Sequence, residues 1–429
     1  MKTFTTYNLG CKVNAYELSA ISSLLIKEGF KEDSNNPDVV IINTCSVTAT
    51  ADQKSRQHIR KMQKLFPRAV VAVMGCYSQG NHKFISEEIK PSILLGTSHR
   101  KDVVDLIKKA LNEGGNYIVI DENTRQFDYE ELGITSYTEN VRAFLKIQDG
   151  CNNFCTYCVV PYRRGKMRSR SKENVIKEAT YLVEQGYQEI VLSGIHVGGY
   201  GQDLKDCSFS ELVETLSNIP GLKSLRISSI EESEIDEKLI KLIQEKDNLA
   251  KHLHIPLQSG ANHVLRMMNR KYTREQFIEK IKYIKSLVPN VMVSGDVIVG
   301  FPQETEEDFQ DTYNLCRECF DMLHVFPYSM RPGTVAARMD GQISPEVKKQ
   351  RSKVILDLSD ELYTNYVSRF INKEVTVLVE KYDAQNGLNI GHTSNYINVK
   401  IPLKESKVGE FITVKLQKDM IESKQTPIV

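Results

Sequence analysis

A repeated alternation of short apolar runs and amphipathic stretches is the feature that most constrains the fold. Between residues 142 and 329, runs typical of buried strands are separated by stretches with helical periodicity. These runs are FLKIQ, EIVLS, SLRISS, HLHIP, VMVSGDVIV and MLHVFPYS. Helices that link successive strands place those strands parallel. We therefore predict a partial (β/α)6 barrel, with its site at the carboxyl ends of the strands.

The regions on either side of this barrel have different patterns. From Thr3 to about Leu111 a similar alternation predicts an open parallel α/β sheet, and residues 112–140 resemble a linker. After a charged helix from Pro345 to about Phe370, the runs EVTVLVEKY, NYINVKIP and GEFITVKLQ predict a small C-terminal β-barrel. The fold class is thus α/β, with predicted divisions at 1–115, 116–137 (linker), 138–368 and 369–429.

Length, charge and cysteine content limit the possible functions. A chain of 429 residues exceeds one ordinary domain, and a net charge of +1 excludes a histone-like polyanion binder while allowing a local basic patch. The sequence has no signal-like start and no apolar run of about 18 residues, so we expect a cytoplasmic protein that does not bind membranes. Nine cysteines in that compartment indicate metal binding or catalysis more than disulfides.

A compact cysteine motif directly follows the first predicted barrel strand. Cys151, Cys155 and Cys158 form C-x3-C-x2-C, and three thiolates on one loop can hold three irons of a 4Fe-4S cluster. Complete protein ligation would take four thiolates, which leaves one iron for a small molecule. The alternatives are a zinc knuckle or three small core residues. The preceding strand and the missing fourth ligand favour the cluster.

A second set of cysteines is dispersed along the N-terminal region. Cys11, Cys45 and Cys76 are 34 and 31 residues apart, and each follows a predicted strand. Parallel strands end at one edge of their sheet, so the three side chains are expected to converge there. Spacing alone leaves open the alternative that they are buried cysteines beside strands.

The other cysteines and the histidines receive structural interpretations. Cys316 and Cys319 lie at i and i+3 of a predicted helix, which suits core packing, and Cys207 is isolated. A lone histidine is more often a hydrogen-bonded structural residue than a ligand. We therefore assign no metal to His196, His254 or His392.

Many segments together resemble one family along the whole chain. They include NLGCKVNAYE, INTCSVTATADQKSRQ, VMGCYSQ, LKIQDGCNNFCTYCVVPYRRGKMRSR, DVIVGFPQETEEDF and HVFPYSMRPGT. These segments are similar to the methylthiotransferase family of radical S-adenosylmethionine enzymes. The resemblance implies two 4Fe-4S clusters, a radical one on Cys151, Cys155 and Cys158 and an auxiliary one on Cys11, Cys45 and Cys76. It also implies S-adenosyl-L-methionine as radical source and methyl donor, and a TRAM domain at the C-terminus.

Further residues are candidates for cofactor or RNA contacts. Small or polar residues at or near predicted strand ends are expected to contact S-adenosylmethionine or substrate: Ser193, Gly194, Ser228, Glu231, Gln258, Asp296, Gly300 and Arg170. A basic run beside the radical motif is expected to attract RNA phosphates, the alternative being a solvated charged face: Arg163, Arg164, Lys166 and Arg168.

The resemblance also extends to one branch of the family. NLGCKVNAYE and SGIHVGGYG resemble the bacterial branch that methylthiolates C2 of N6-threonylcarbamoyladenosine at tRNA position 37. This implies a tRNA with that nucleoside and a low-potential electron donor such as flavodoxin as partners, and no DNA. The alternatives are action on N6-isopentenyladenosine, whose branch has a YGCQMN-like start, and a noncatalytic iron-sulfur electron carrier.

Overall fold

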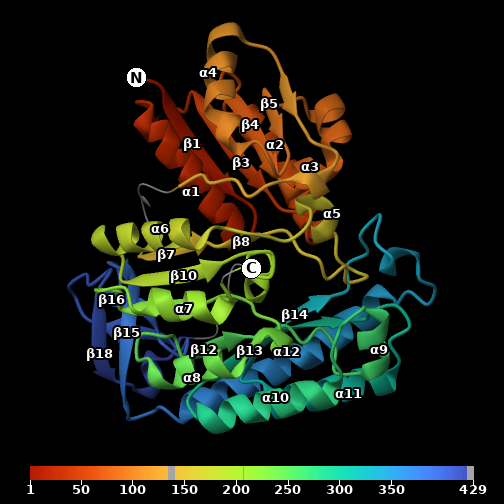
Figure 1. Ribbon diagram of the computed structural model, residues 1–429, viewed down its shortest axis with the longest axis vertical. Helices are drawn as coiled ribbons and strands as arrows, with labels where there is room; N and C mark the ends of the chain where they lie inside the picture. The colour runs from red at the N-terminus through yellow and green to blue at the C-terminus, as the bar shows by residue number, and fades with distance from the viewer. Residues whose placement is uncertain (134–140, 206, 423–429) are drawn as a thin grey trace.

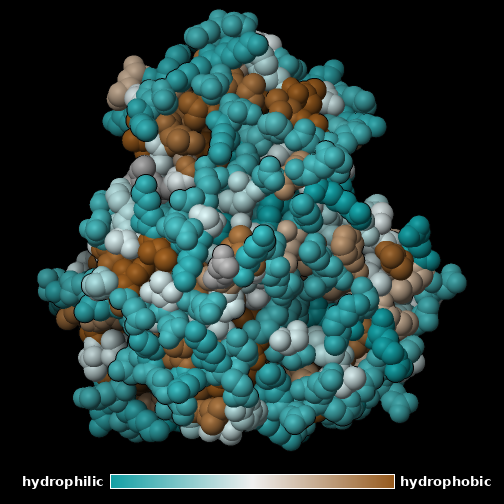
Figure 2. All heavy atoms as spheres, in the orientation of Figure 1, coloured by the Kyte–Doolittle hydropathy of each residue, from teal (hydrophilic) through white to brown (hydrophobic). Residues whose placement is uncertain are grey.

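The computed structural model describes residues 1–133, 141–205 and 207–422. Figure 1 shows an N-terminal α/β part above a barrel, with a C-terminal sheet beside the barrel. None of the described helices has the length and apolarity needed to cross a membrane. The face seen in Figure 2 is mostly hydrophilic, with scattered apolar patches.

The N-terminal part is a parallel sheet covered on both faces. Within residues 1–133 its strand order is β2-β1-β3-β4-β5-β6. Every residue of β3 and β4 is buried, as expected for a parallel sheet between two helical layers. β6 lies within the stretch expected to be a linker. The strands are β1 (Thr3–Asn8), β2 (Lys31–Glu32), β3 (Val39–Thr44), β4 (Val70–Gly75), β5 (Ile93–Leu95) and β6 (Tyr117–Val119), and the α-helices are α1 (Lys12–Lys27), α2 (Ala49–Leu65), α3 (Cys76–Phe84) and α4 (Val103–Glu113).

The central part confirms the predicted partial barrel. In the described part of residues 141–330, two three-stranded parallel sheets, β7-β10-β11 and β12-β13-β14, are joined by parallel bridges from Leu225 to Leu249 and from Ser229 to His254. The strands are β7 (Arg142–Lys146), β10 (Glu189–Ser193), β11 (Ser224–Ile227), β12 (His252–His254), β13 (Met292–Val299) and β14 (Met322–Pro327). The surrounding helices are α6 (Lys172–Glu184), α7 (Phe209–Ser217), α8 (Glu237–Glu245), α9 (Asn262–Met267), α10 (Arg274–Leu287) and α11 (Glu306–Cys319).

Side-chain caps fix where several barrel helices begin. Thr273 and Gln276 form a capping box at the start of α10, and Thr305 and Asp308 form another at α11. Between β7 and α6 lie a short antiparallel ribbon, β8 (Gln148–Asp149) with β9 (Arg168–Ser169), and the helix α5 (Val160–Arg164). The cysteine motif lies between β8 and α5.

The C-terminal part is an antiparallel sheet in the order β17-β16-β15-β18. It follows α12 (Pro345–Ser368), whose Tyr363 and Tyr366 share a core with Val377 and Val399 of the sheet. β16 was not predicted, because its LNIGHT run lacks an apolar alternation. Its Gly391 fits where an added Cβ would lie 2.0 Å from the Leu378 carbonyl oxygen. The strands are β15 (Glu374–Asp383), β16 (Leu388–Thr393), β17 (Asn398–Pro402) and β18 (Phe411–Lys415).

Candidate active site

The sheet brings the three dispersed cysteines together. Cys11 is the N-cap of α1, Cys45 follows β3 and Cys76 begins α3 directly after β4. β3 pairs with both β1 and β4, so these residues lie at the carboxyl ends of adjacent strands. Burial, followed by the nearby thiols of Cys76 and Cys11, raises the pKa of Cys45 to about 12. The convergence predicted from the topology is therefore present.

A glycine turn makes the approach of Cys76 possible. Gly75 has a φ of 105°, and an added Cβ would lie 2.4 Å from Asn43 Oδ1 and 2.5 Å from the Thr44 carbonyl oxygen. Asn43 Oδ1 accepts a hydrogen bond from Asn14 Nδ2 at 2.6 Å. This turn allows α3 to begin at Cys76, with its sulfur beside α1 and β3.

The compact motif forms the second thiol group on one loop. The Cys151 amide donates to the Gly165 carbonyl at 3.1 Å, and the Cys158 amide donates to the Cys155 carbonyl at 2.9 Å. Burial, with contributions from Cys155 and Cys151, raises the pKa of Cys158 to about 12. The Thr156 amide, between Cys155 and Cys158, donates to the Met268 carbonyl at 3.1 Å, so the loop is also anchored to the second half of the barrel.

A guanidinium contacts a cysteine sulfur in each group. Arg164 donates from Nε to Cys76 Sγ at 3.2 Å, and Arg270 Nη1 lies 3.6 Å from Cys155 Sγ. Burial raises the pKa of Cys76, and the Arg164 guanidinium opposes that rise. The thiolate is the form that binds iron. All nine cysteines, each among the described residues, are free. The two groups therefore have the donor chemistry that two iron-sulfur clusters require.

Neither group has the geometry of a mononuclear metal site. Among the residues that the structure describes, no three Cys, His, Asp or Glu side chains are grouped as one metal ion requires. A single zinc ion would draw its thiolates within about 2.3 Å of one point, whereas a 4Fe-4S cluster binds each thiolate through a different iron.

A small pocket borders the compact motif. It has a volume of about 60 Å³ and is lined by Cys155, His196, Glu231 and Arg270, among others. Arg270 pairs with Glu231, and His196 Nε2 lies 2.6 Å from Glu234. Burial would lower the pKa of His196, but Cys151 and Glu234 raise it to about 10. Arg270 is thus a charged neighbour of the motif that the sequence pattern did not identify, and His196, which was interpreted as a structural residue, is a second charged neighbour.

The predicted cofactor residues near the strand ends occupy several environments. Ser193 is buried at the end of β10, and its Oγ has no hydrogen-bond partner among the described residues. The next residue is Gly194, where an added Cβ would lie 3.0 Å from Gln148 Oε1. Ser228 follows β11 and donates its amide to the Leu192 carbonyl at 3.2 Å. The buried hydroxyl of Ser193, beside a glycine, can therefore still form a hydrogen bond with a ligand.

The remaining residues of that set lie on the second half of the barrel or away from it. Gln258 and Gly300 have left-handed backbones, with φ of 67° and 71°. Asp296 lies within β13, and its carboxylate is 3.2 Å from His254 Nε2. Arg170 instead pairs with Glu131 and Glu178, at 2.7 Å each. The Arg170 guanidinium is therefore already ion-paired within the protein, and its predicted cofactor contact stays a prediction.

The basic run contains two deeply buried side chains. Arg164 is fully buried and pairs with Glu17 at 2.9 Å and Asp149 at 3.1 Å. Arg168 is buried and pairs with Asp149 at 3.3 Å, whereas Lys166 is exposed. The expectation that Arg164 and Arg168 contact RNA is corrected, since their charges are used inside the protein.

These ion pairs join the N-terminal sheet to the barrel. Glu17 of α1 also pairs with Arg100 and with Lys146 of β7, each at 3.0 Å. Burial would raise the pKa of Glu17, but Arg100, Arg164 and Lys146 hold it below its ordinary value. Asp149, next to the compact motif, also forms an ion pair with Lys146, with 2.7 Å between Asp149 Oδ2 and Lys146 Nζ. Sequence reasoning missed this network because its members are far apart along the chain.

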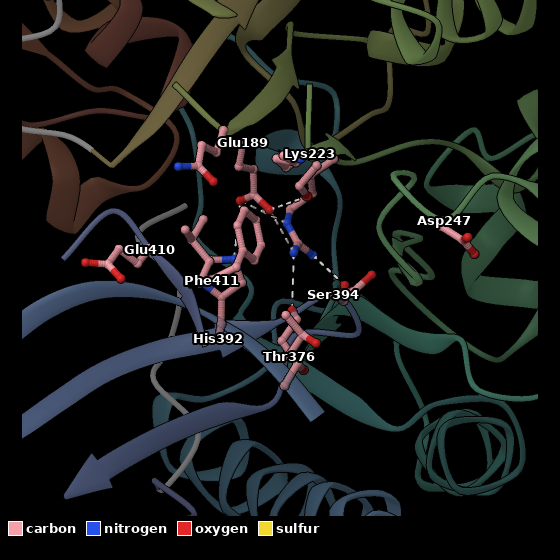
Figure 3. Close-up of a pocket in the computed structure, with 13 residues that line it drawn as sticks. Glu189, Lys223, Asp247, Thr376, His392, Ser394, Glu410 and Phe411 are labelled. Atoms are coloured by element: carbon pink, nitrogen blue, oxygen red, sulfur yellow. Dashed lines mark hydrogen bonds and ion pairs between the residues drawn. The ribbon is translucent and has the colours of Figure 1, made fainter. Parts of the chain in front are cut away.

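A larger cavity lies at the other end of the barrel. About 590 Å³ in volume, it is lined by Glu189 and Ser224 at the amino ends of β10 and β11 and by His392 and Phe411 of the C-terminal sheet. Figure 3 shows Glu189 directed toward a guanidinium, and that group is Arg226 at 3.2 Å. His392 reaches the same carboxylate at 3.3 Å. The cavity therefore belongs to the junction with the C-terminal sheet, remote from the cysteines.

Family models match the three structural parts in order. The models are the uncharacterized protein family UPF0004 over residues 3–96, the Radical SAM superfamily over 145–316 and the TRAM domain over 368–420. Structure comparison gives TsrM from Kitasatospora setae, a radical S-adenosylmethionine methyltransferase, with a TM-score of 0.58 and 15% identity over 79% of this chain and 77% of that one. This likeness concerns the fold. The barrel and its cysteine loop thus define a radical S-adenosylmethionine protein.

Full-length relatives then give the family. The chain is 43% identical to the threonylcarbamoyladenosine tRNA methylthiotransferase MtaB of Bacillus subtilis, over 97% of this chain and 94% of the relative. It is also 34% identical to a tRNA-2-methylthio-N(6)-dimethylallyladenosine synthase of Pelotomaculum thermopropionicum, over 96% and 95%. The chain belongs to the tRNA methylthiotransferase family of radical S-adenosylmethionine enzymes, as the sequence motifs predicted. Relatives with two different nucleoside substrates are similar to it along the whole chain.

Proposed function

We propose that this enzyme methylthiolates C2 of N6-threonylcarbamoyladenosine at tRNA position 37. The observation that carries the proposal is the pair of three-thiol groups, at the carboxyl edges of the N-terminal sheet and of the barrel. The identity of 43% to the Bacillus subtilis enzyme supports the threonylcarbamoyl substrate over the isopentenyl one, whose Pelotomaculum relative is 34% identical.

The cysteines divide into two ligand sets in this proposal. Cys151, Cys155 and Cys158 hold the cluster that binds S-adenosylmethionine, and Cys11, Cys45 and Cys76 hold the auxiliary cluster. When bound, these groups supply radical C–H activation and the sulfur that is transferred. Arg270 and Arg164 place positive charge at one sulfur of each set, and hydrogen bonds to cluster sulfurs adjust reduction potential.

Residues around the barrel mouth position the cofactor and substrate. Ser193 offers an unpartnered hydroxyl at the end of β10, and the absent side chain of Gly194 leaves its backbone close to Gln148. Ser228, Glu231, Gln258, Asp296 and Gly300 remain proposed contacts. The ion-paired layer around Glu17 and Asp149 closes the junction behind the thiols, since these side chains are buried. This arrangement holds the two thiol groups in a fixed relation.

The proposal includes an RNA-facing side and a cellular setting. Exposed Lys166 and half-buried Arg163 are the members of the basic run left to contact phosphates. The predicted divisions at 1–115, 116–137, 138–368 and 369–429, a cytoplasmic location and an electron donor such as flavodoxin belong to the same proposal.

The test is a reaction on defined RNA. Anaerobically reconstituted enzyme is incubated with S-adenosylmethionine, a reductant and anticodon stem-loops carrying either nucleoside, and the products are measured by nucleoside mass spectrometry. We expect 2-methylthio-N6-threonylcarbamoyladenosine and little product from the isopentenyl stem-loop. Preference for the isopentenyl stem-loop would assign the other substrate. Absence of S-adenosylmethionine cleavage and of product with both RNAs would support an electron carrier.

A further inference from the structure

A buried arginine of the barrel region contacts the Cys45 loop, which is the stretch 45–48 between β3 and α2. Arg331 comes shortly after β14, and only 4% of it is exposed. Its Nη2 donates to Ser46 Oγ at 3.0 Å and to Asp52 Oδ2, in the first turn of α2, at 2.7 Å. This arginine therefore holds the Cys45 loop and the start of α2 against the barrel region.

The same segment also contacts the compact motif. We call residues 331–336 the Arg331 turn. The hydroxyl and the amide of Thr334 both donate to the Arg331 carbonyl, at 2.7 and 3.1 Å, which closes the turn. At its other end the Ala336 amide donates to the carbonyl of Thr156, within the compact motif, at 2.9 Å. One short turn therefore joins the loops of the two cysteine groups.

A second connection between the two groups runs through α5. The Val160 amide at the start of this helix donates to Cys158 Sγ at 3.4 Å, and Arg164 at its end donates to Cys76 Sγ at 3.2 Å. This connection reaches the auxiliary group at the strand end of β4, whereas the Arg331 turn reaches it at the strand end of β3. The relation between the two groups is thus set at two separate places.

We propose that Arg331 is a positioning residue that keeps the two cysteine groups in the relation that methylthio transfer requires. The inference rests on the two cluster sites of the proposed function and not on the choice of nucleoside. The reacting carbon must stay within reach of both sites, and a displacement of about 1 Å can slow such a reaction about 100-fold. Loss of Arg331 should release the Cys45 loop. The compact motif should stay in place, because Thr156 also donates to the carbonyls of Met267 and Met268.

Two other roles fit this arginine less well. Direct contact with the substrate is disfavoured, because the guanidinium is buried and its Nη2 already donates to two protein oxygens. An ion pair that only joined the two regions would need Asp52 alone. Arg331 also contacts the residue after Cys45, and its turn contacts Thr156. Contacts at both loops favour a role in their relative position.

The experiment measures how well radical formation is coupled to methylthio transfer. Anaerobically reconstituted wild type, Arg331→Gln, Arg331→Lys, Asp52→Asn and the double variant Arg331→Gln, Asp52→Asn are incubated with S-adenosylmethionine, a reductant and a threonylcarbamoyladenosine stem-loop. Chromatography measures 5′-deoxyadenosine, and mass spectrometry measures the methylthiolated nucleoside. Arg338→Gln, at an exposed position just after the turn, is the matched control.

Hydrogen exchange gives a readout that does not depend on turnover. The Ala49 amide donates to Ser329 Oγ at 3.0 Å, so release of this part of the chain from the barrel region should expose it. Peptides covering residues 45–52 and 151–158 are followed by mass spectrometry in the reconstituted proteins. In Arg331→Gln, exchange in the first peptide should rise about 10- to 100-fold, as for the loss of a hydrogen bond to a charged group. Exchange in the second peptide should keep its wild-type rate.

The expected result is radical formation without transfer. Arg331→Gln should form 5′-deoxyadenosine within about twofold of wild type and about 10- to 100-fold less methylthiolated nucleoside. Asp52→Asn should change the ratio in the same direction, and the double variant should be no worse than Arg331→Gln, because the two residues share one contact. Arg331→Lys, which keeps the cation, should recover part of the coupling. Arg338→Gln should keep all of it, and iron content should equal that of wild type throughout.

Three outcomes would overturn the inference. The first is a wild-type ratio of the two products in Arg331→Gln. The second is a parallel loss of both products, or of iron, in Arg331→Gln and Arg331→Lys, which would make Arg331 a residue of stability alone. The third is faster exchange in both peptides, which would mean general loosening. In each case, methylthio transfer by the wild type leaves the proposed function intact. A wild type that acts only on the isopentenyl stem-loop changes the substrate, and the same ratios are then measured on that RNA.

Discussion

The two thiol groups are similar in chemistry and differ in how the chain builds them. Cys151, Cys155 and Cys158 lie within eight consecutive residues on one loop. Cys11, Cys45 and Cys76 come from three strands, and only the pairing of β3 with β1 and β4 brings them together. Each group has a guanidinium at one sulfur. The compact motif gathers its thiols within one short loop, whereas the dispersed group depends on the pairing of three strands of the sheet.

Removal of one thiol from each group should separate their roles and has the largest expected effect. Cys151→Ala should abolish both S-adenosylmethionine cleavage and methylthio transfer. Cys45→Ala should keep cleavage and stop transfer. Chromatography of 5′-deoxyadenosine measures S-adenosylmethionine cleavage, and nucleoside mass spectrometry measures methylthio transfer. The iron content of the wild type, expected at about eight irons per chain for two clusters, is the reference for the variants. Methylthiolated tRNA from Cys45→Ala would show that the dispersed group is not a cluster site.

Arg164→Gln should break the connection between the two regions. It leaves the buried carboxylates of Glu17 and Asp149 undercompensated, which should cost about 3–5 kcal/mol in the free energy of unfolding. It also removes the hydrogen bond to Cys76, so the auxiliary iron should be lost more readily. Urea denaturation and iron content measure these effects. Arg60→Gln, at an exposed position on α2, is the control, and equal behaviour of the two variants would contradict the prediction.

Gly75→Ala should damage the dispersed group and spare the local one. The backbone at Gly75 costs a non-glycine residue about 1–3 kcal/mol, and the added Cβ would contact Asn43 and Thr44. Auxiliary iron should fall while S-adenosylmethionine cleavage persists. Gly29 has a similar φ of 84° but open space around an added Cβ. Gly29→Ala should therefore lose stability through backbone strain alone and keep its auxiliary iron. Loss of cleavage in Gly75→Ala would mean that the two groups are not independent.

Alkaline pH should destabilise both groups alike in the metal-free protein, with the smallest effect. Burial raises the pKa of Cys45 and of Cys158 from 9.0 to about 12. In the unfolded chain these thiols ionise near their ordinary pKa, so the stability that they contribute is complete below pH 9 and is lost between pH 9 and about 12. Urea midpoints at pH 8 and pH 10 measure the loss. A Cys45→Ser, Cys158→Ser variant should show a flatter profile, and an unchanged slope would count against the buried thiols.

Sequence patterns were sufficient for features with a local or periodic origin. The six barrel runs have strand composition and are separated by helices, three of which begin with capping boxes, so the barrel could be predicted from them. The compact cysteine motif needed its spacing, the strand before it and the missing fourth ligand. The convergence of Cys11, Cys45 and Cys76 required one further step, that parallel strands end at a common edge.

Features that depend on distant partners could not be predicted in this way. Arg164 and Arg168 lie in a basic run that was expected to attract RNA phosphates, but Glu17 and Asp149 pair with them inside the protein. Glu17 is 147 residues from Arg164 in the chain, and no local pattern reports that pairing. β16 was missed for a related reason, since Gly391 is selected by contact with β15 and not by strand propensity.

The position of Glu17 sets a limit on modular exchange between proteins. This carboxylate is supplied by α1, but two of its three cationic partners, Lys146 and Arg164, belong to the barrel region. An N-terminal sheet grafted onto a foreign barrel would retain Arg100 and lose the other two charges. A chimera made at this junction is therefore expected to fold only when the segment from Lys146 to Arg164 is transferred together with the N-terminal sheet.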